Sequence, residues 1–408
     1  MNGSKFGILG GGMVAGYAAK QLVELGLRPG ELTILSADSS VPYERPPLSK
    51  SFLAGKDSED AIRINAEDFY RKNGIELKLK CEISAVDAQR RRLILKSGGE
   101  FEFNKLIVAT GARPRKLTIP GANLQNLCYL RTLEDSKAIR NTLEEVKHAV
   151  VIGGGFIGME VAAVLTQKGV TVTMVLNEDR IWRRLFSPEM SSFFEAYYAA
   201  QGVRLIKSTA VSQLRGDGAV SSAVLANGQV MPCEMVVAGI GVVPATEMLT
   251  NSGLHVEDGI IVNEYLETSQ PDVFAAGDVA NYQDVLFGRR RRVEHWDNAV
   301  SQGQYCAQSL MGARIPFKHV PYFFSDVFDL SYEFWGDSSG ADQIIHRGDF
   351  SNKSFSVWWL RQKTVVAAFT MNRPDEERDA ALKWIESRQT VSAEKLEDAS
   401  TSLVTAAG

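Results

Sequence analysis

Residues 147–160 read KHAVVIGGGFIGME, and residues 5–16 read KFGILGGGMVAG, so one glycine-rich phrase occurs twice in the chain. Each copy opens with a short apolar run, passes through three consecutive glycines and continues into a stretch with helical spacing. This order predicts a strand, a tight turn and a helix. Because one dinucleotide needs only one such turn, the repeat predicts two dinucleotide-binding units.

The small residues of each turn have separate physical roles. The first glycine permits the tight turn, the second lets the backbone approach a pyrophosphate, and the third small residue lets the helix pack closely on the strand. The helix N-terminus adds N–H donors and the positive end of its dipole. The residues expected in these positions are Gly10, Gly12 and Ala15 in the first unit and Gly153, Gly155 and Gly158 in the second.

A carboxylate follows the second expected strand of each unit. In the first unit the helix 14–25 leads to the strand 32–35 and then to Asp38, and in the second the strand 170–175 leads to Glu178. A dinucleotide fold places an acidic residue here for a ribose hydroxyl. Apolar strands at 105–110, 235–239 and 271–278 are expected to complete the sheets.

The composition bounds the class of protein. The chain has 408 residues, 45% of them hydrophobic, which predicts two or three domains. A net charge of −4 argues against a nucleic-acid partner. No apolar run reaches the roughly 18 residues of a membrane span, and no signal-peptide pattern opens the chain. These features predict a cytoplasmic protein.

Four cysteines, Cys81, Cys128, Cys233 and Cys306, lie far apart without metal-ligand spacing. A disulfide framework, a zinc site and a protein-bound iron–sulfur cluster are therefore not expected, and we predict no metal site. The four are interpreted as small buried apolar residues.

Beyond about residue 312 the glycine turns stop. The runs 355–360 and 364–369, separated by Arg361, Gln362 and Lys363, predict a hairpin in a terminal α+β domain. From Ser392 the chain becomes polar and small, so we expect a loosely held tail.

Four motifs resemble the signature set of FAD- and NAD(P)H-dependent ferredoxin and rubredoxin reductases: PYERPPLSK at 42–50, ATGARPR at 109–115, GIGVVPAT at 239–246 and TSQPDVFAAGDVA at 268–280. The stretches 184–207 and 328–337 look most similar to plant-type monodehydroascorbate reductases. The resemblance implies an α/β fold with two Rossmann-like domains arranged as in glutathione reductase, plus the C-terminal α+β domain. We expect FAD to bind 1–113 with 241–312, NAD(H) to bind 114–240, and the terminal domain to span 313–408.

The resemblance also implies roles for single residues. Asp278 would accept a ribityl hydroxyl, and Arg45 would face the FAD pyrophosphate. Lys50 would lie beside the isoalloxazine ring, and Glu160 near that ring and the nicotinamide. If the two meet, they form a buried ion pair that orders the hydride-transfer site; alone, Lys50 is a solvated cation and Glu160 a helix-start carboxylate. Further expected cofactor contacts are Thr110, Gly111, Gly241, Gly277, Glu294, His295 and Trp296.

The electron exit is expected around VEHWDNA at 293–299 and PYFFSD at 321–326. His295, Trp296, Phe323 and Phe324 would cover the flavin or line the acceptor channel, or else belong to an aromatic core. Together with Lys50 and Glu160, we assign Trp296 and Phe324 to the catalytic set.

Glu178 favours NADH over NADPH because a carboxylate repels a 2′-phosphate. The nearby Arg180, Arg183 and Arg184 weaken the prediction of NADH, because arginine suits a 2′-phosphate. They equally resemble a solvated helix face.

The reaction type depends on an absent motif. Disulfide reductases of this architecture carry a Cys-x4-Cys pair early in the FAD domain, and here no cysteine precedes Cys81. Electrons would therefore leave directly from tightly, non-covalently bound FAD, which takes a hydride from NADH and gives single electrons to an acceptor. Arg289, Arg290, Arg291 and Arg292 would steer an acidic partner, or form a solvated loop.

Three acceptors stay open: a small acidic ferredoxin, the monodehydroascorbate radical, and a quinone or another small molecule. Val300 and Phe324 stand where the resemblance places an Arg and a Tyr that hold the organic radical, whereas Trp296 and Asp326 match the ferredoxin-reductase pattern. A ferredoxin is therefore the first expectation. A flavoprotein that senses redox state, with its NADH-reduced form controlling partner association, is the alternative of another class. The oligomeric state stays open.

Overall fold

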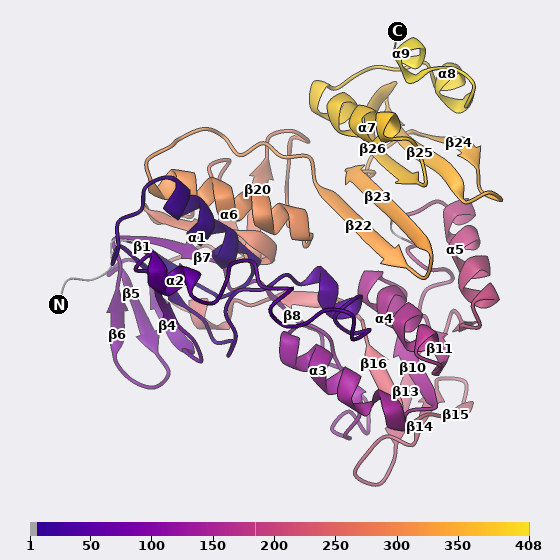
Figure 1. Ribbon diagram of the computed structural model, residues 1–408, viewed down its shortest axis with the longest axis horizontal. Helices are drawn as coiled ribbons and strands as arrows, with labels where there is room; N and C mark the ends of the chain where they lie inside the picture. Colours follow the sequence, from indigo (N-terminus) through magenta and orange to yellow (C-terminus); the bar gives the residue numbers. More distant parts are fainter. Residues whose placement is uncertain (1–5, 184, 408) are drawn as a thin grey trace. The chain divides into compact units, whose positions relative to one another are not determined.

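The computed structural model describes residues 6–183 and 185–407, which form two compact units. Unit 1 consists of Met1–Arg45, Glu59–Arg113 and Val243–Phe323, and unit 2 of Pro46–Ser58, Pro114–Val242 and Phe324–Gly408. Figure 1 labels their helices and strands. The short segment Pro46–Ser58 belongs to unit 2 although chain on both sides of it belongs to unit 1. The domain limits expected from the sequence stay a prediction.

A five-stranded parallel sheet forms the centre of unit 1. Its strand order is β19 (Val273–Ala275), β7 (Lys105–Val108), β1 (Phe6–Leu9), β2 (Leu32–Leu35), β3 (Glu76–Lys78). In β1 and β2 all four residues are buried. Such uninterrupted burial is typical of parallel strands that are covered on both faces. The strands expected at 6–9, 32–35 and 105–110 are confirmed.

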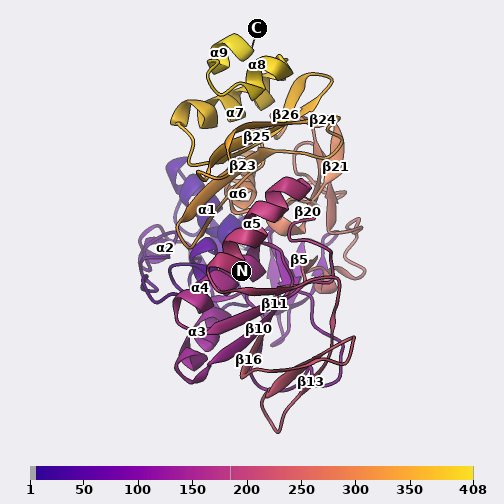
Figure 2. The same ribbon diagram turned by 90° about the vertical axis from the view of Figure 1, so that its right-hand side faces the viewer.

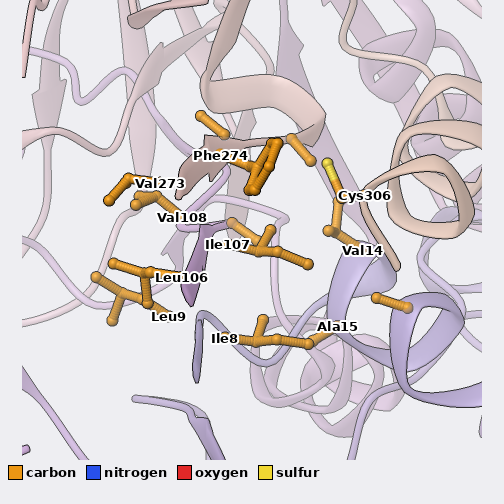
Figure 3. Packing of buried hydrophobic residues seen from close by; sticks show 14 of the residues in the cluster. Ile8, Leu9, Val14, Ala15, Leu106, Ile107, Val108, Val273, Phe274 and Cys306 are labelled. Atoms are coloured by element: carbon orange, nitrogen blue, oxygen red, sulfur yellow. The ribbon is translucent and has the colours of Figure 1, made fainter. Parts of the chain in front are cut away.

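Two helices pack together beside this sheet. They are α1 (Met13–Glu24) and α6 (Trp296–Leu310). Their backbones approach closely at Gly303, where a Cβ would lie 2.8 Å from the carbonyl oxygen of Val14. Figure 3 shows Ile8, Ile107 and Val14 among the buried side chains of this core.

Unit 1 also contains shorter elements. Two three-stranded sheets consist of β4 (Ile83–Asp87), β5 (Arg92–Leu95) and β6 (Glu100–Glu102), and of β18 (Ile260–Val262), β20 (Ala280–Asp284) and β21 (Arg289–Arg291). The remaining helical segments are α2 (Phe69–Lys72), η3 (Glu247–Leu249) and η4 (Gly277–Val279).

Unit 2 repeats the parallel arrangement. Its sheet has the order β12 (Arg204–Ile206), β11 (Thr171–Val175), β10 (His148–Ile152), β16 (Met235–Ala238), β9 (Leu127–Cys128). Helix α4 (Phe156–Gln167) follows β10 and contacts it. Also present are η1 (Pro46–Ser49), α3 (Leu133–Thr142), η2 (Leu143–Glu145), α5 (Pro188–Ala200), β13 (Val211–Arg215), β14 (Ser222–Leu225) and β15 (Val230–Pro232). The chain passes between the units at β8 (Ala112–Pro114) and β17 (Val242–Pro244).

The last part of the chain forms a sheet with the order β22 (Tyr322–Val327), β23 (Leu330–Gly336), β26 (Thr364–Met371), β25 (Ser354–Arg361), β24 (Gln343–Asp349). The expected hairpin is confirmed as β25 and β26. Gln362 and Lys363 have positive φ of 51° and 66°, as the tight turn between two antiparallel strands requires. Helix α7 (Asp375–Ser387) covers β26, as Figures 1 and 2 show.

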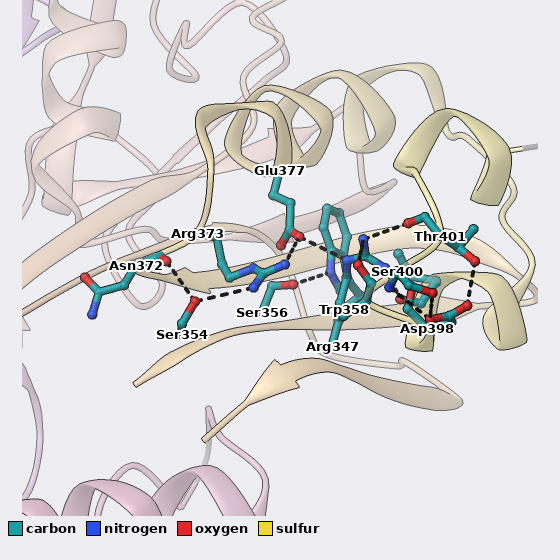
Figure 4. A network of polar contacts seen from close by, with 12 residues as sticks. Arg347, Ser354, Ser356, Trp358, Asn372, Arg373, Glu377, Asp398, Ser400 and Thr401 are labelled. Carbon is teal, nitrogen blue, oxygen red and sulfur yellow. Dashed lines mark hydrogen bonds and ion pairs between the residues drawn. The ribbon is translucent and has the colours of Figure 1, made fainter. Parts of the chain in front are cut away.

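The expectation of a loosely held tail was wrong. Beyond Ser392 the chain forms α8 (Ala393–Glu397) and α9 (Leu403–Ala406), whose residues Leu396 and Leu403 are buried. Arg347 of β24 donates hydrogen bonds to the carbonyl oxygens of Leu396 at 3.0 Å, Asp398 at 2.5 Å and Thr401 at 2.8 Å (Figure 4). The polar composition of this segment suggested a loose tail. The buried guanidinium of Arg347 instead donates hydrogen bonds to the carbonyl oxygens of the segment and holds it in place.

The same guanidinium takes part in a buried ion pair. Arg347 Nε lies 3.0 Å from Glu377 Oε1, to which Arg373 also donates at 2.5 Å. Burial alone would raise the pKa of Glu377, but hydrogen bonds from Arg373, Ser356 and Arg347 bring it below its ordinary value.

Among the described residues, no helix is both long and apolar enough to cross a membrane.

We predict that Arg347→Met releases the tail, because it removes the carbonyl contacts and leaves Glu377 with one cation fewer. Breaking such a pair costs about 3–5 kcal/mol. Amide hydrogen exchange should accelerate in α8 and α9. Arg378→Met is the matched control, since this half-exposed arginine pairs with Glu333 at the surface and should change exchange little. Unchanged exchange in the tail of Arg347→Met would contradict the role of Arg347.

The lowered pKa of Glu377 also gives a pH dependence. Its folded-state pKa lies below the ordinary 4.5, so the pair contributes stability above pH 4.5 that is lost as the pH falls through the lowered value. Exchange of the tail amides, corrected for intrinsic rates, should rise in that acidic window, and Glu377→Gln should flatten the change.

Candidate functional site

The first glycine turn joins β1 to α1 in unit 1. Gly10 has φ 123°, and a Cβ there would lie 2.1 Å from the carbonyl oxygen of Ala109, so only glycine is accommodated. Ala15 is fully buried on α1. Gly12 caps the helix, and a Cβ there would lie 3.6 Å from Arg45 Nη2. A helix N-terminus without side chains, faced by a guanidinium, suits a pyrophosphate.

The second turn joins β10 to α4 in unit 2. Gly153 has φ 106°, and a Cβ there would lie 2.3 Å from the carbonyl oxygen of Gly239; at Gly158 it would lie 2.2 Å from that of Gly153. A Cβ on Gly155, in contrast, would meet no atom within 4 Å. The first and third glycines therefore serve the packing of the chain, and the second leaves the approach to the helix N-terminus open. Both turns fit the phosphates of a dinucleotide.

Asp38 lies just beyond β2, as expected for a ribose-binding carboxylate. One of its oxygens accepts the Ser40 N–H at 3.1 Å and the other the Tyr43 hydroxyl at 2.8 Å. These donors fix the half-buried carboxylate in place, and each oxygen still has a further lone pair for a hydroxyl group.

Glu178 lies beyond β11 of unit 2 with an exposed side chain. The next residue, Asp179, pairs with Arg183 at 3.2 Å and with Arg180 at 3.7 Å. Arg184 lies outside the described residues. One carboxylate therefore occupies two of the nearby cations, and Glu178 adds a negative charge of its own.

The Gly277–Asp278 turn of unit 1 is held from two sides. Gln302, fully buried on α6, accepts the Gly277 N–H at 2.7 Å. Arg292 donates to the Asp278 carbonyl oxygen at 3.0 Å, and also pairs with Glu294 at 2.7 Å. The side chain of Asp278 is buried, as expected for a ribityl contact. Glu294, assigned to the cofactor from the sequence, is thus an ion-pair partner of the arginine that braces this turn.

The arginine run 289–292 is not a solvated loop, so that interpretation was wrong. Its first three residues form β21, which pairs with β20. Arg290 donates to the carbonyl oxygens of Val262 and Asn281 at 2.7 and 2.6 Å. Arg291 forms a buried ion pair with Asp284. The guanidinium groups of Arg290, Arg291 and Arg292 therefore bind within unit 1, which argues against the run as a free basic patch for a partner.

Thr110, Gly111 and Gly241 shape the turns that follow β7 and β16. The Thr110 hydroxyl donates to the carbonyl oxygen of Ala245 at 2.7 Å. Gly111 and Gly241 have positive φ of 68° and 94°. Gly241 accepts a backbone hydrogen bond from Arg115 at 2.9 Å. Their part in cofactor binding stays a prediction, and the Thr110 hydroxyl has a structural partner.

His295 and Trp296 begin helix α6. The His295 ring lies 5.0 Å from the Phe323 ring between centroids, and burial lowers the pKa of His295 to about 4 although the charges of Asp278 and Asp297 oppose it. The imidazole is therefore neutral near pH 7. Trp296 donates its indole N–H to the carboxylate of Glu44 at 2.5 Å.

Unit 2 contains a buried carboxylate that is bonded through both of its oxygens. Glu160 on α4 is 5% exposed, and its Oε1 lies 2.7 Å from Lys50 Nζ and 2.6 Å from the donating hydroxyl of Ser325. Ser49 donates to the other oxygen. The expected meeting of Lys50 and Glu160 is confirmed, and the readings of Lys50 as a solvated cation and Glu160 as a plain helix-start carboxylate were wrong. The Phe324 ring lies 5.8 Å from Lys50 Nζ.

Two phenols adjoin this carboxylate. Burial raises the pKa of both Tyr198 and Tyr332 well above the ordinary value, and the charge of Glu160 adds to the rise. Tyr198 donates to the carbonyl oxygen of Met159, the residue before Glu160. Both phenols therefore stay neutral near pH 7.

Four residues of these sites escaped the sequence interpretation: Glu44, Ser49, Gln302 and Ser325. Three of them adjoin an assigned residue, since Ser49 precedes Lys50, Glu44 precedes Arg45 and Ser325 follows Phe324. Their position next to an assigned residue was the sequence signal by which they could have been identified. Gln302 offered none, because an amide in a helix is ordinarily exposed.

The thiols are unsuited to redox relay. All four cysteines are free, with Cys81 and Cys128 half-buried and Cys233 and Cys306 buried. Burial raises the pKa of Cys128 to about 11 and of Cys233 to about 12. Protonated thiols are poor nucleophiles, so these two are inert near neutral pH.

The pyridine nucleotide-disulphide oxidoreductase model matches residues 4–303. The chain belongs to this family. A second model, the reductase C-terminal domain, matches residues 322–407. Membership implies FAD and a pyridine nucleotide as cofactors, in agreement with the two glycine turns, and makes the chain an oxidoreductase.

Similar proteins include both expected branches. A peroxisomal monodehydroascorbate reductase of Arabidopsis thaliana is 36% identical over 412 residues, covering 96% of this chain and 84% of that protein. A ferredoxin reductase from Rhodopseudomonas palustris has a TM-score of 0.94 at 33% identity, covering 99% of this chain and 100% of its own. Putidaredoxin reductase in covalent complex with putidaredoxin has a TM-score of 0.92 at 32% identity, with 98% and 96% covered.

We predict that Gly155→Val folds normally but blocks the pyridine nucleotide, because the new side chain has room within the protein and fills the approach to the helix N-terminus. Flavin content should stay unchanged, and reduction by NADH should slow about tenfold or more as phosphate contacts are lost. Gly12→Val is the reciprocal variant and should lower the flavin content. If Gly155→Val lost flavin and Gly12→Val did not, the two sites would be reversed.

Proposed function

We propose that this chain takes a hydride from NADH onto tightly bound FAD and passes single electrons to a small iron–sulfur protein. The observation that carries the proposal is the lack of a usable dithiol: no cysteine precedes Cys81, and the pKa values of the half-buried Cys128 and the buried Cys233 are raised to about 11 and about 12. Electrons must therefore reach an external acceptor without a disulfide step. A cytoplasmic location, expected from the sequence, is part of this proposal.

The residues of unit 1 would bind and orient FAD, which when bound supplies hydride acceptance and single-electron release. The turn of Gly10 and Gly12 with Arg45 would hold its pyrophosphate, and Asp38 and Asp278 its hydroxyl groups. A neutral His295 adds no positive charge near the cofactor.

In unit 2, the turn of Gly153 and Gly155 would hold the pyrophosphate of the nicotinamide cofactor. Lys50 and Glu160 would present a fixed ion pair to the reacting rings. Because Ser49 and Ser325 already satisfy the carboxylate, this pair needs little reorganisation during hydride transfer.

Two features support NADH rather than NADPH. Glu178 is exposed where the ribose is expected, and Asp179 occupies Arg180 and Arg183. A 2′-phosphate would meet a carboxylate and find two of the nearby cations already paired.

We predict that Glu178→Gln shrinks the preference for NADH about tenfold, chiefly by improving kcat/KM for NADPH. Asp179→Asn is the companion variant: it should also improve NADPH, because it frees Arg180 and Arg183. Steady-state kinetics with both cofactors give the measurement. Equal kcat/KM values for NADH and NADPH in the parent protein would contradict the assignment of Glu178.

Two observations support an iron–sulfur protein as the acceptor: the side chains at positions 300 and 324, and the similarity to known reductases. Val300 is half-buried against the core of unit 1, and Phe324 offers only an aromatic ring beside Lys50. An anionic organic radical would gain no charge-assisted hydrogen bond from either side chain. The similarity to putidaredoxin reductase, solved in covalent complex with putidaredoxin, and to a ferredoxin reductase supports the same choice. Monodehydroascorbate is the second candidate because of the 36% identity to a plant reductase of that radical.

The acceptor is tested by reoxidation of the NADH-reduced protein. The protein would be reduced anaerobically and mixed separately with a [2Fe–2S] ferredoxin, monodehydroascorbate and a quinone, while flavin absorbance is followed. We expect the ferredoxin to reoxidise the flavin fastest. Saturable turnover of monodehydroascorbate without ferredoxin activity would contradict the proposal and favour monodehydroascorbate as the acceptor. Slow reoxidation by all three, with a change of oligomeric state on NADH addition, would favour the redox-sensing alternative.

A further inference from the structure

Glu44 has a contact set that the proposed reaction does not use. It lies inside PYERPPLSK, between Tyr43 and Arg45, and its carboxylate is half-buried. One oxygen accepts the hydroxyl of Tyr17 on α1, and the other accepts the indole N–H of Trp296 on α6, both at 2.5 Å. Two packed helices are therefore tied to one carboxylate.

Both donors are neutral groups. In the part of the chain that the structure describes, no lysine or arginine forms an ion pair with Glu44. Burial raises the pKa of Tyr17 above its ordinary range, and the hydrogen bond and charge of Glu44 raise it further, so the phenol remains a donor. Hydrogen bonds to an ionised acceptor are roughly twice as strong as neutral ones.

This contact restricts what Trp296 can do. An indole has one donor and no acceptor, and here Glu44 takes that donor. The Trp296 side chain can therefore contact a ligand only through its ring, in an orientation that the carboxylate sets.

The neighbours of Glu44 point to FAD as the ligand. Tyr43 donates to Asp38, which we assign to the ribose, and the Arg45 guanidinium faces Gly12 of the pyrophosphate turn. Three consecutive residues thus contact the ribose carboxylate, the Trp296 ring and the phosphate turn.

We infer that Glu44 is a positioning residue that fixes the Trp296 ring against bound FAD. The inference rests on the proposed function in one respect, that FAD binds unit 1. Glu44 donates no hydrogen bond to the cofactor and acts through Trp296. Tyr17 donates to its second carboxylate oxygen.

The test compares Glu44→Leu, Glu44→Gln and Trp296→Phe with the double variant of Glu44→Leu and Trp296→Phe. The first readout is the indole N–H resonance of 15N-labelled tryptophan, assigned by its loss in Trp296→Phe. Glu44→Leu should move this resonance and speed its solvent exchange. Glu44→Gln should preserve it, because the amide oxygen can accept the indole N–H while the amide nitrogen donates to Tyr17.

The second readout is the FAD dissociation constant of each protein. Glu44→Leu should raise it about tenfold, the order expected for a lost charge-assisted hydrogen bond. Glu44→Gln should stay within about twofold of the parent. In the Trp296→Phe background, Glu44→Leu should cause no further change, because the two residues act as one unit. Glu24→Leu, which alters an exposed carboxylate at the end of α1, is the matched control and should leave both readouts unchanged.

Additive effects on FAD binding in the double variant would overturn the inference, because Glu44 would then act independently of Trp296. Failure of Glu44→Gln to retain the indole signal would also overturn it. If the parent protein bound no FAD at all, the proposed function would fail instead, and the indole resonance would still report whether Glu44 holds Trp296.

Discussion

The buried charge of Glu160 is the constraint on which the arrangement of unit 2 depends. A carboxylate removed from water is strongly unfavourable unless each oxygen finds donors. Here the donors come from two parts of the chain: Lys50 and Ser49 from the segment that includes η1, and Ser325 from β22. Removing Lys50 alone would leave an uncompensated charge at a cost of about 3–5 kcal/mol. This explains why Pro46–Ser58 belongs to unit 2 rather than to the chain that surrounds it.

The two glycine turns show how one local motif serves both folding and binding. In each turn a positive-φ glycine lets the backbone pass a carbonyl oxygen where a Cβ would clash, so Gly10 and Gly153 are required by the chain itself. Gly12 and Gly155 have extended backbone that any residue can adopt, and a Cβ on either meets no close protein atom. The packing of the chain therefore does not require glycine at these two positions, in contrast to Gly10 and Gly153.

Most of the charged side chains near the assigned sites are occupied within their own unit. Arg292 braces the Asp278 turn, Arg291 pairs with Asp284, and Asp179 holds Arg180 and Arg183. Counting basic residues along the sequence therefore overestimates the positive field offered to a partner.

The sequence by itself determined the parallel strands, both glycine turns, the place of Asp38 and Glu178 after the second strand of each unit, and the terminal hairpin, because each depends on residue types within a few positions of one another. It also indicated that Lys50 and Glu160 could meet. Only the tertiary structure decided that Ser325 completes that pair, that Glu44 contacts Trp296, that Arg290, Arg291 and Arg292 bind groups of unit 1 and that Arg347 holds the tail. These contacts join residues that are far apart in the chain. Because polar partners follow no periodic sequence pattern, only the packing of the folded chain determines which of them meet.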